Sequence, residues 1–400
     1  MRRSRLGAAL AGLVLALGAP VASAAPFAYV ANLNSSSVSQ FDAGAGPLAP
    51  LTPPTIGAGE FPQDVAVSPD GASVYVANAS NVLSANTVAQ FSIAANGSLV
   101  PKSPPSVPAG NTPTRIAVRP DGASLYVTNT LEGTVSQYSV TTGSTLVPKA
   151  PPTVAAGIQP GGIAITPEGS SVYLADAVGQ TVLQYSVGAG GALSPKTPAA
   201  VVTGAGPLRV AVSPDGGSVY VTNYTAGTVS QYSVGAGGAL VAKVPATVSL
   251  GRGAFDVVVS PDGRNAYVTN AEQGTVTQYA RAADGRLVPL SPAAVTAGPG
   301  AEDVVVSPDG RFVYVANSSG ASVSQYARSQ SGPLTPLTPA TVATGRTPFA
   351  IAITPSPAGP ATKEQCKDGG WRRFGTFRNQ GDCVSSVATR GGRPPNAAGG

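Results

Sequence analysis

The segment Tyr126-Val127-Thr128-Asn129 decides the fold of this 400-residue chain, because near copies of it recur along the sequence. The last four intervals between copies are each 47 residues. A repeat of roughly 40 to 50 residues, rich in short apolar runs and turn residues, is typical of a β-propeller or another solenoid. The period therefore predicts one large body built from similar units. The copies begin at Tyr29, Tyr75, Tyr126, Tyr173, Tyr220, Tyr267 and Tyr314.

One repeat from the middle of the chain predicts four short strands. It opens with an apolar run at 115–118, which suits a strand sandwiched between neighbouring sheets. A Pro-Asp-Gly turn at 120–122 leads to a second strand over 124–128, and a third follows over 134–140. The fourth run, 146–154, contains three prolines, which cannot donate to a strand ladder, so it is predicted to form the outer edge. Four such strands make one propeller blade.

The two ends of the repeat region predict how the ring closes. Residues from Phe27 onward supply only strands two to four of a blade, because no inner strand precedes Tyr29. Near the other end, Phe349–Ile353 matches an inner strand with no second strand after it. Joining these partial copies completes a seventh blade and leaves no open apolar end. The sequence therefore predicts an all-β, seven-bladed propeller of four-stranded blades, closed by its C-terminal inner strand.

Three regions are expected along the chain: a signal peptide over 1–24, the propeller over 25–357, and a linker with a basic tail over 358–400. Residues 1–24 combine three arginines, an apolar run too short to span a bilayer comfortably and the small-residue site Ala22-Ser23-Ala24. The expected location is secreted, extracellular or periplasmic. Cys366 and Cys383 are predicted to form a disulfide there, which is favoured over two free thiols or half of a zinc site.

The net charge of +5 does not indicate nucleic-acid binding once it is divided by region. Residues 1–24 carry +3 and residues 361–400 carry +4, whereas residues 25–360 hold 14 basic and 16 acidic side chains. A nearly neutral body offers no electrostatic footprint for a phosphate backbone. No cofactor or metal motif is present, and the acidic turns such as Asp121 carry one carboxylate each, too few for a calcium loop.

Function is expected where the copies differ, at the mouth of the central tunnel. The turns before strand one and between strands two and three share one face, and the positions that enter strand one vary most. Two further irregularities map to this face: a four-residue insertion within 79–86 and the single tyrosine outside the repeat pattern. The ligand-binding candidates are Asp64, Arg115, Arg209, Tyr224, Asp256, Glu302 and Asp303.

Two interpretations of these charges are open. In the first, Arg115 pairs with Asp64 and Arg209 pairs with Asp256, and the ion pairs stabilise adjacent blades. In the second, the arginines hold an anionic ligand while the neighbouring carboxylates supply a base or bind a cation, since adjacent carboxylates raise one another's pKa. The first interpretation is favoured slightly, because opposite charges on neighbouring repeats commonly serve that purpose.

The repeated motifs YVTN, SPDG (as at Ser68–Gly71) and SQY resemble those of the YVTN-repeat, lactonase-like seven-bladed propellers, over Phe27 to about Thr354. The resemblance implies the fold strongly and an activity weakly, because these motifs are structural. Family members include 6-phosphogluconolactonase-like enzymes, in which histidine, glutamate and arginine are associated with catalysis, and this chain has no histidine. The segment from Lys363 to Val384 resembles a cysteine-framed tail of exported bacterial proteins.

The leading hypothesis is a secreted propeller that binds a small molecule, polymer or protein without catalysis. The first alternative is a lactonase, for which Glu302, Asp303 and Arg209 are the catalytic candidates: a carboxylate base with a raised pKa and an arginine for the oxyanion. The second alternative is a module that contacts the cell envelope through the basic tail.

Overall fold

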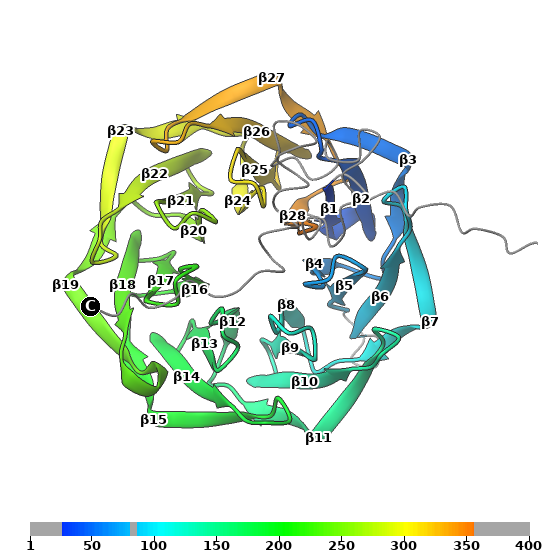
Figure 1. Cartoon of the computed structure of the whole chain (residues 1–400), viewed down its shortest axis with the longest axis horizontal. Helices are drawn as coiled ribbons and strands as arrows, with labels where there is room; N and C mark the ends of the chain where they lie inside the picture. Colours follow the sequence, from blue (N-terminus) through cyan, green and yellow to red (C-terminus); the bar gives the residue numbers. More distant parts are fainter. Residues whose placement is uncertain (1–25, 81–85, 356–400) are drawn as a thin grey trace, which may run out of the picture.

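The computed structural model describes residues 26–80 and 86–355, and these form a closed ring of seven four-stranded antiparallel sheets (Figure 1). The predicted signal peptide, most of the predicted insertion at 79–86 and the predicted disulfide tail lie outside the described residues. The inner strands line the central tunnel, with each one beside the inner strand of the next blade. These seven are β4 (Pro62–Val67), β8 (Pro113–Val118), β12 (Pro160–Ile165), β16 (Pro207–Val212), β20 (Ala254–Val259), β24 (Ala301–Val306) and β28 (Pro348–Ile353).

The other three layers follow outward from the tunnel in the order of the repeat. The second strands are β1 (Phe27–Asn32), β5 (Ser73–Asn78), β9 (Ser124–Asn129), β13 (Ser171–Asp176), β17 (Ser218–Asn223), β21 (Asn265–Asn270) and β25 (Phe312–Asn317). The third are β2 (Ser37–Asp42), β6 (Thr87–Ile93), β10 (Thr134–Val140), β14 (Thr181–Val187), β18 (Thr228–Val234), β22 (Thr275–Arg281) and β26 (Ser322–Arg328). The outer strands are β3 (Ala49–Gly57), β7 (Leu99–Pro108), β11 (Leu146–Ala155), β15 (Leu193–Val202), β19 (Leu240–Ser249), β23 (Leu287–Thr296) and β27 (Leu334–Ala343). Within the described residues, two short 3-10 helices, η1 (Leu33–Ser35) and η3 (Ala236–Gly238), lie in the connections between strands.

The ring closes as the sequence predicts. Strand β28 pairs antiparallel with β1, so the sheet order of this blade is β28-β1-β2-β3. The Thr354 side chain also accepts a hydrogen bond from the Phe27 backbone amide, at 2.8 Å. The prediction that the two chain ends share one blade is therefore confirmed.

The second strand of each blade is buried along its whole length, apart from the partly exposed Phe312 at the start of β25, and its tyrosine is fully enclosed between adjacent sheets. The tyrosine hydroxyl, however, reaches a backbone carbonyl of the following blade: Tyr126 donates to Gly191 at 2.6 Å. At the closing boundary, Tyr314 donates in the same way to Gly46. Burial without such a partner would cost the hydroxyl its hydrogen bond to water. The repeated tyrosine thus both packs and orients neighbouring blades.

A repeated glutamine on the third strand makes a second connection between blades. The Gln184 side-chain oxygen accepts a hydrogen bond from the Leu240 amide of the following blade at 2.7 Å, and its amide group donates to the Pro198 carbonyl of its own outer strand at 3.0 Å. The same inter-blade bond recurs at every boundary of the ring. The seven glutamines are Gln40, Gln90, Gln137, Gln184, Gln231, Gln278 and Gln325.

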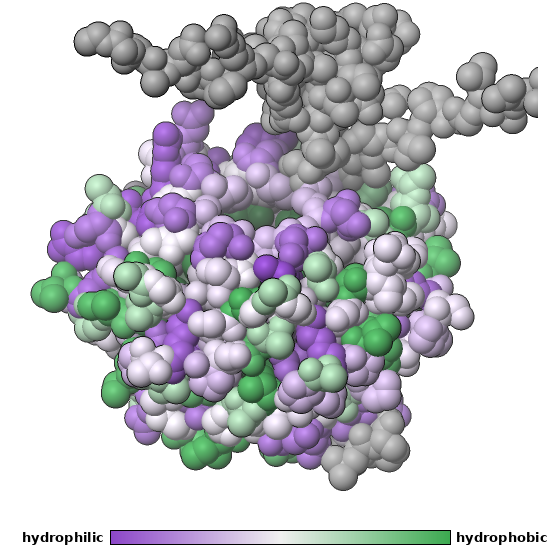
Figure 2. All heavy atoms as spheres, turned by 60° about the horizontal axis from the view of Figure 1, so that its bottom comes forward, coloured by the Kyte–Doolittle hydropathy of each residue, from purple (hydrophilic) through white to green (hydrophobic). Residues whose placement is uncertain are grey.

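The surface of the ring has two ends that are formed by different turns. We call the end where the inner strands begin the mouth face, and the end that carries the SPDG turns, such as Ser68–Gly71, the turn face. In the space-filling view, hydrophilic residues gather around the hollowed centre of the ring, whereas the sides alternate between hydrophilic and apolar patches (Figure 2). The outer strands contribute exposed apolar side chains there, including Val202 and Val244. None of the helices in the described ranges is long and apolar enough to cross a membrane.

Candidate functional site

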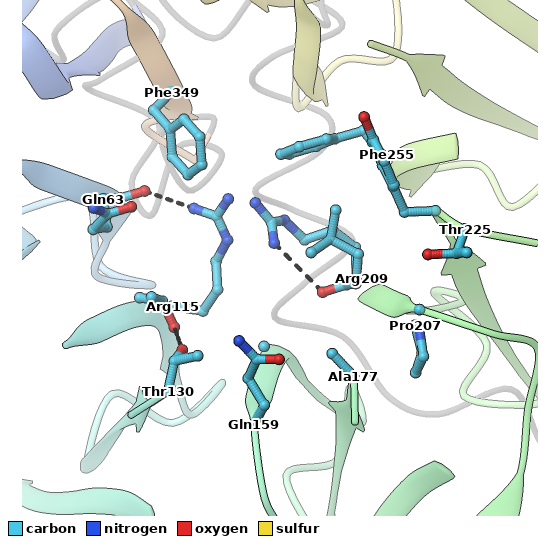
Figure 3. A pocket seen from close by; sticks show the side chains of 15 residues that line it. Gln63, Arg115, Thr130, Gln159, Ala177, Pro207, Arg209, Thr225, Phe255 and Phe349 are labelled. Atoms are coloured by element: carbon cyan, nitrogen blue, oxygen red, sulfur yellow. Dashed lines mark hydrogen bonds between the residues drawn. The ribbon is translucent and has the colours of Figure 1, made fainter. Parts of the chain in front are cut away.

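A pocket of about 370 Å³ opens on the mouth face, at one end of the tunnel. Its walls come from the starts of inner strands and from residues that follow the second strands, which are the two kinds of turn expected to share a face. Arg115, Arg209 and Tyr224 line the pocket together with Phe255 and Phe349 (Figure 3). The structure thus brings three of the predicted candidates into one cavity.

Arg115 is held rigidly by its surroundings. Its side chain is 6% exposed, its Nη1 donates to the Gln63 carbonyl at 2.7 Å, and the same nitrogen lies 3.3 Å from Asp64 Oδ1. The guanidinium carbon lies 5.2 Å from the centre of the Phe349 ring, a cation–π distance. Its Nε and Nη2 have no hydrogen-bond partner among the described residues. The first of the two expected ion pairs is therefore present, and one edge of the guanidinium stays free.

Arg209 has the same arrangement without a carboxylate. The residue is 7% exposed, its guanidinium carbon lies 4.9 Å from the centre of the Phe255 ring, and its Nη1 donates to the Leu208 carbonyl at 3.4 Å. Within the described ranges no carboxylate oxygen lies within 4.0 Å of it, so the expected ion pair with Asp256 was wrong. The reason is that the guanidinium stacks on Phe255, and the Asp256 carboxylate binds elsewhere. Nε and Nη2 of Arg209 are again buried and unpartnered.

The blade between the two arginines lacks side chains at two positions of its inner strand that face the gap. Its inner strand β12 has Gly161 and Gly162 at the second and third positions, where the flanking strands carry Thr114 and Arg115, or Leu208 and Arg209. A Cβ on Gly162 would lie 2.6 Å from the Arg209 Cα, so only glycine permits this approach of β12 to β16. With these two positions of β12 bare, both guanidinium groups point into the same space (Figure 3).

Aromatic rings form the wall of the pocket next to the two arginines. Phe255 and Phe349 meet edge to face, with ring centres 6.0 Å apart, and Tyr224 makes a similar contact with Phe255 at 6.3 Å. Such edge-to-face packing fixes the rings, and the rings in turn fix the planes of the guanidinium groups stacked on them. The pocket is therefore a preorganised cleft with two cationic edges and an apolar wall.

The predicted aspartates connect inner strands and do not line this pocket. Asp64 Oδ2 accepts a hydrogen bond from the Ile116 amide of the next inner strand at 2.7 Å. Asp256 does the same to the Val304 amide, at 3.0 Å. Asp303 continues the series with the amide at position 351, at 2.8 Å. Each carboxylate satisfies a backbone donor on the tunnel side of a strand edge, which is a structural role that the sequence did not reveal.

Burial raises the pKa of all three aspartates. The pKa of Asp64 rises to about 6, although the Arg115 charge opposes the shift. Burial and the neighbouring Asp303 charge raise the pKa of Asp256 well above its usual value, and burial raises the pKa of Asp303, while the Arg115 charge opposes that rise. Two carboxyls in contact cannot both ionise without a penalty. The expectation that adjacent carboxylates raise one another's pKa therefore fits Asp256, and burial is the larger cause.

Glu302 lies beside the pocket and does not line it. Its Oε1 accepts a hydrogen bond from the Ser318 hydroxyl at 2.7 Å, and its Oε2 is buried without a hydrogen-bond partner among the described residues. Burial raises the pKa of the Glu302 carboxyl to about 7. Over residues 26–80 and 86–355, no three acidic, histidine or cysteine side chains are arranged to hold a metal ion.

The residues that line the pocket agree only in part with the predicted site. Sequence variation among the copies located Arg115, Arg209 and Tyr224, but Phe255 and Phe349 were missed. A signal for them was available, because the second position of the inner strand varies as widely as the third, from Gln63 to Phe349. The structure thus defines a seven-bladed propeller whose mouth carries two buried, partly unpaired arginines on an aromatic wall.

The chain belongs to the family described as lactonase, 7-bladed beta-propeller, which it matches over residues 20–157, 80–255 and 159–353. Among solved structures it is similar to a "putative 6-phosphogluconolactonase" from Bacteroides fragilis, with 19% identity and a TM-score of 0.70, covering 82% of this chain and 97% of that chain. It is also similar to a periplasmic gluconolactonase from Pseudomonas aeruginosa, with 22% identity and a TM-score of 0.68, covering 82% and 99%. A functionally unknown protein from Desulfotomaculum acetoxidans is also similar, with 18% identity, a TM-score of 0.66 and coverage of 82% and 99%. At these identities the likeness concerns the fold. None of the curated proteins matches the chain.

Proposed function

We propose that this protein binds an anionic small molecule in the mouth pocket, between Arg115 and Arg209, without catalysing a reaction. The observation that carries the proposal is the pair of free guanidinium edges: Nε and Nη2 of both residues are buried and lack partners among the described residues. A buried donor without an acceptor costs about 1–3 kcal/mol, and more when it is charged. An oxyanion seated between the two edges removes that cost and receives up to four charge-assisted hydrogen bonds.

The charge balance of the mouth supports an anion. Asp64 is paired with Arg115, whereas Arg209 has no carboxylate partner in the described part of the chain. The raised pKa values of Asp256 and Asp303 reduce the negative charge that the tunnel presents beneath the pocket. An anion that enters the mouth therefore meets a net positive wall, and the guanidinium planes are already fixed by the rings.

The size and lining of the pocket restrict the kinds of ligand that it can hold. A cavity of about 370 Å³ lies at the small end of ligand sites in proteins. Arg115 and Arg209 supply the polar edges, and the rings on which they stack add apolar surface beside them, so the ligand carries a carboxylate or phosphate group on a compact body with one apolar face. A sugar acid or a small aromatic acid has these properties.

Calorimetric titration tests the proposal with gluconate, 6-phosphogluconate, benzoate and inorganic phosphate, and with glucose as the uncharged control. We expect at least one anion to bind, and Arg209→Met to weaken it by roughly 10- to 100-fold, because a hydrogen bond to a charged group is worth about 1.5–3 kcal/mol. Arg286→Met serves as the matched control, since Arg286 is exposed and pairs with Asp284 outside the pocket. Equal affinity in Arg209→Met and in the control would contradict the proposal.

A lactonase is the second candidate function, and one observation favours it. The Glu302 carboxyl has a pKa of about 7, which suits a general base, and the arginines would stabilise the developing oxyanion. The structural neighbours named as lactonases add weight through the shared family. The assay is hydrolysis of a panel of sugar lactones. A rate that rises through an inflection near pH 7 and disappears in Glu302→Gln supports the lactonase, and a folded protein inactive on the whole panel contradicts it.

Export is part of the proposal, because residues 1–24 are predicted to be a signal peptide that is cleaved after Ala24. The mouth pocket would then bind its anion outside the cytoplasm. N-terminal sequencing of the protein from the culture medium or the periplasm tests this, with Ala25 as the expected first residue. Recovery of the uncleaved chain from the cytoplasm alone would contradict it. Retention at the envelope through residues 361–400 remains a separate proposal, to be measured by fractionation of cells that express the chain without them.

A further inference from the structure

A second polar cavity lies on the turn face, at the boundary between the β4–β7 blade and the β8–β11 blade. Its volume is about 540 Å³, and its lining includes Ser68, Asp70, Gly122 and Val140. It is separate from the mouth pocket, with which it shares no residue. Because the blades repeat, each of the other boundaries of the ring has an equivalent position.

At one later boundary the position is filled by an arginine. Arg281, the last residue of β22, reaches across to the preceding blade, where its Nη2 lies 2.7 Å from Asp215 Oδ2. Its Nε donates to the Tyr220 hydroxyl at 3.0 Å, and its Nη1 donates to the Gly263 carbonyl at 3.4 Å. Nη2 also donates to the Ser218 hydroxyl at 3.2 Å. Carboxylate, hydroxyls and carbonyl together surround the guanidinium.

The next boundary repeats this arrangement. Arg328, the last residue of β26, places its Nη2 2.8 Å from Asp262 Oδ2 and donates from Nε to the Tyr267 hydroxyl at 3.0 Å. Its Nη1 donates to the Gly310 carbonyl at 3.0 Å. Two boundaries therefore share the carboxylate, tyrosine and carbonyl contacts, and at the second Asn265 Oδ1 accepts, at 2.6 Å, the bond that Ser218 accepts at the first.

At the boundary that holds the cavity, the receptors are present and the arginine is absent. Val140 ends β10 at the position that Arg281 and Arg328 occupy in their strands. Asp70 and Gly122 take the places of Asp215 and Gly263, and both line the cavity. An acidic turn is by itself no site, so a further feature is needed to indicate a ligand.

That feature is the hydroxyl of Ser73. It stands at the position of Ser218, which accepts a hydrogen bond from Arg281. Ser73 is fully buried, and its Oγ has no hydrogen-bond partner among the described residues. The hydroxyl that contacts a guanidinium in one copy is thus left unpaired in the copy that has lost the arginine.

Neighbouring cations do not fill the cavity. Lys102 donates to the Ser92 hydroxyl at 3.1 Å and to the Gly143 carbonyl at 3.4 Å. Lys243 makes the corresponding bonds at the boundary where Arg281 is also present, so this lysine position and the arginine position are separate.

At the boundary between the β8–β11 blade and the β12–β15 blade, a guanidinium group occupies the equivalent position although the third strand β14 ends in a valine, as β10 does. Arg119, from a different part of the repeat, pairs with Asp121 at 2.9 Å and donates to the Gly169 carbonyl at 3.2 Å. The residue that corresponds to Arg119 at the cavity is Ser68, whose side chain is too short to do so.

We propose that the cavity at Asp70 is a binding site for a guanidinium group, supplied by an arginine side chain of a polypeptide. Two sources share this chemistry. Pro355, the last described residue, packs against Gly71 beside Asp70, and the 45 residues after it include five arginines. The other source is an arginine on a second protein.

The test uses the full chain labelled with ¹⁵N and titrated with methylguanidinium chloride, and with methylammonium chloride as the control cation. We expect saturable shifts of the Asp70 and Gly122 amide signals with methylguanidinium, and at least tenfold weaker binding of methylammonium, which lacks the planar fork. Val140→Arg should abolish the shifts, because the new side chain occupies the site from within. Val187→Arg is the matched control, since Arg119 already pairs with the aspartate at that boundary.

A variant with the five arginines after Pro355 changed to glutamine distinguishes the two sources. If these arginines occupy the site, the variant binds methylguanidinium at least about threefold more tightly than the unchanged chain; equal affinity assigns the site to an arginine of another protein. The proposal is overturned if neither chain shows saturable binding, or if binding persists unchanged in Val140→Arg.

Discussion

The glutamine of the third strand offers a sharp stability prediction, because one side chain spans two blades. In Gln184→Met the volume is kept, but the Leu240 amide loses its acceptor and the Pro198 carbonyl loses its donor. The Leu240 amide is buried, so the unsatisfied donor costs about 1–3 kcal/mol, and the second bond adds about 1 kcal/mol. The expected loss in the free energy of unfolding is therefore about 2–4 kcal/mol.

Urea denaturation and thermal melting measure this loss. At roughly 2 °C per kcal/mol for a domain of this size, the melting temperature should fall by about 4–8 °C. Gln273→Met is the matched control, because the Gln273 side chain is exposed on a turn and should change stability by less than about 0.5 kcal/mol. Amide hydrogen exchange gives a local readout, in which the Leu240 amide should exchange faster in Gln184→Met.

The reasoning is refuted if Gln184→Met is as stable as the Gln273→Met control. That outcome would mean that the inter-blade hydrogen bond contributes nothing beyond the packing of the sheets. A loss of stability without faster exchange at Leu240 would assign the effect to packing instead of the hydrogen bond.

Two further predictions concern the tunnel and the mouth. Because folding raises the pKa of Asp256, the folded state binds protons more tightly than the unfolded state, so stability is lost as pH rises from the ordinary value near 3.8 through the raised pKa. Asp256→Asn should flatten the fall in melting temperature as the pH rises above 3.8, and an unchanged pH dependence would contradict this. Gly162→Ala places a Cβ 2.6 Å from the Arg209 backbone, so it should destabilise the protein by about 1–3 kcal/mol and weaken anion binding. Gly190→Ala, in open space, should do neither. Calorimetry measures the binding and melting curves measure the stability, and equal behaviour of the two variants would count against the close approach of β12 and β16.

Much of the architecture could be predicted because each blade repeats the same local chemistry. The period of Tyr126 and its copies identified the blades, the prolines of the fourth run identified the outer strand, and the unmatched ends at Phe27 and Phe349 identified the closure. These are short-range patterns that every copy restates. The hydrogen bonds of the repeated tyrosine and glutamine to the next blade were not predicted, because they join residues more than 50 positions apart.

The site was predicted less completely for a physical reason. Variation at one register position located Arg115 and Arg209, but their partners depend on which rotamer each long side chain adopts. Arg209 stacks on Phe255 and leaves Asp256 to bind a backbone amide, a choice between two nearby contacts that sequence order does not decide. The glycines of β12, which give both arginines access to the same space, carry no side chain to attract notice.

The most direct test of the central claim is a crystal structure of the protein grown with selenate, whose anomalous signal locates the anion. The account predicts a selenium peak in the mouth pocket, with oxygens about 2.7–2.9 Å from Nε and Nη2 of both Arg115 and Arg209. An empty pocket at high selenate, with the Arg209 guanidinium turned onto the Asp256 carboxylate, would contradict it and restore the ion pair as the role of these residues.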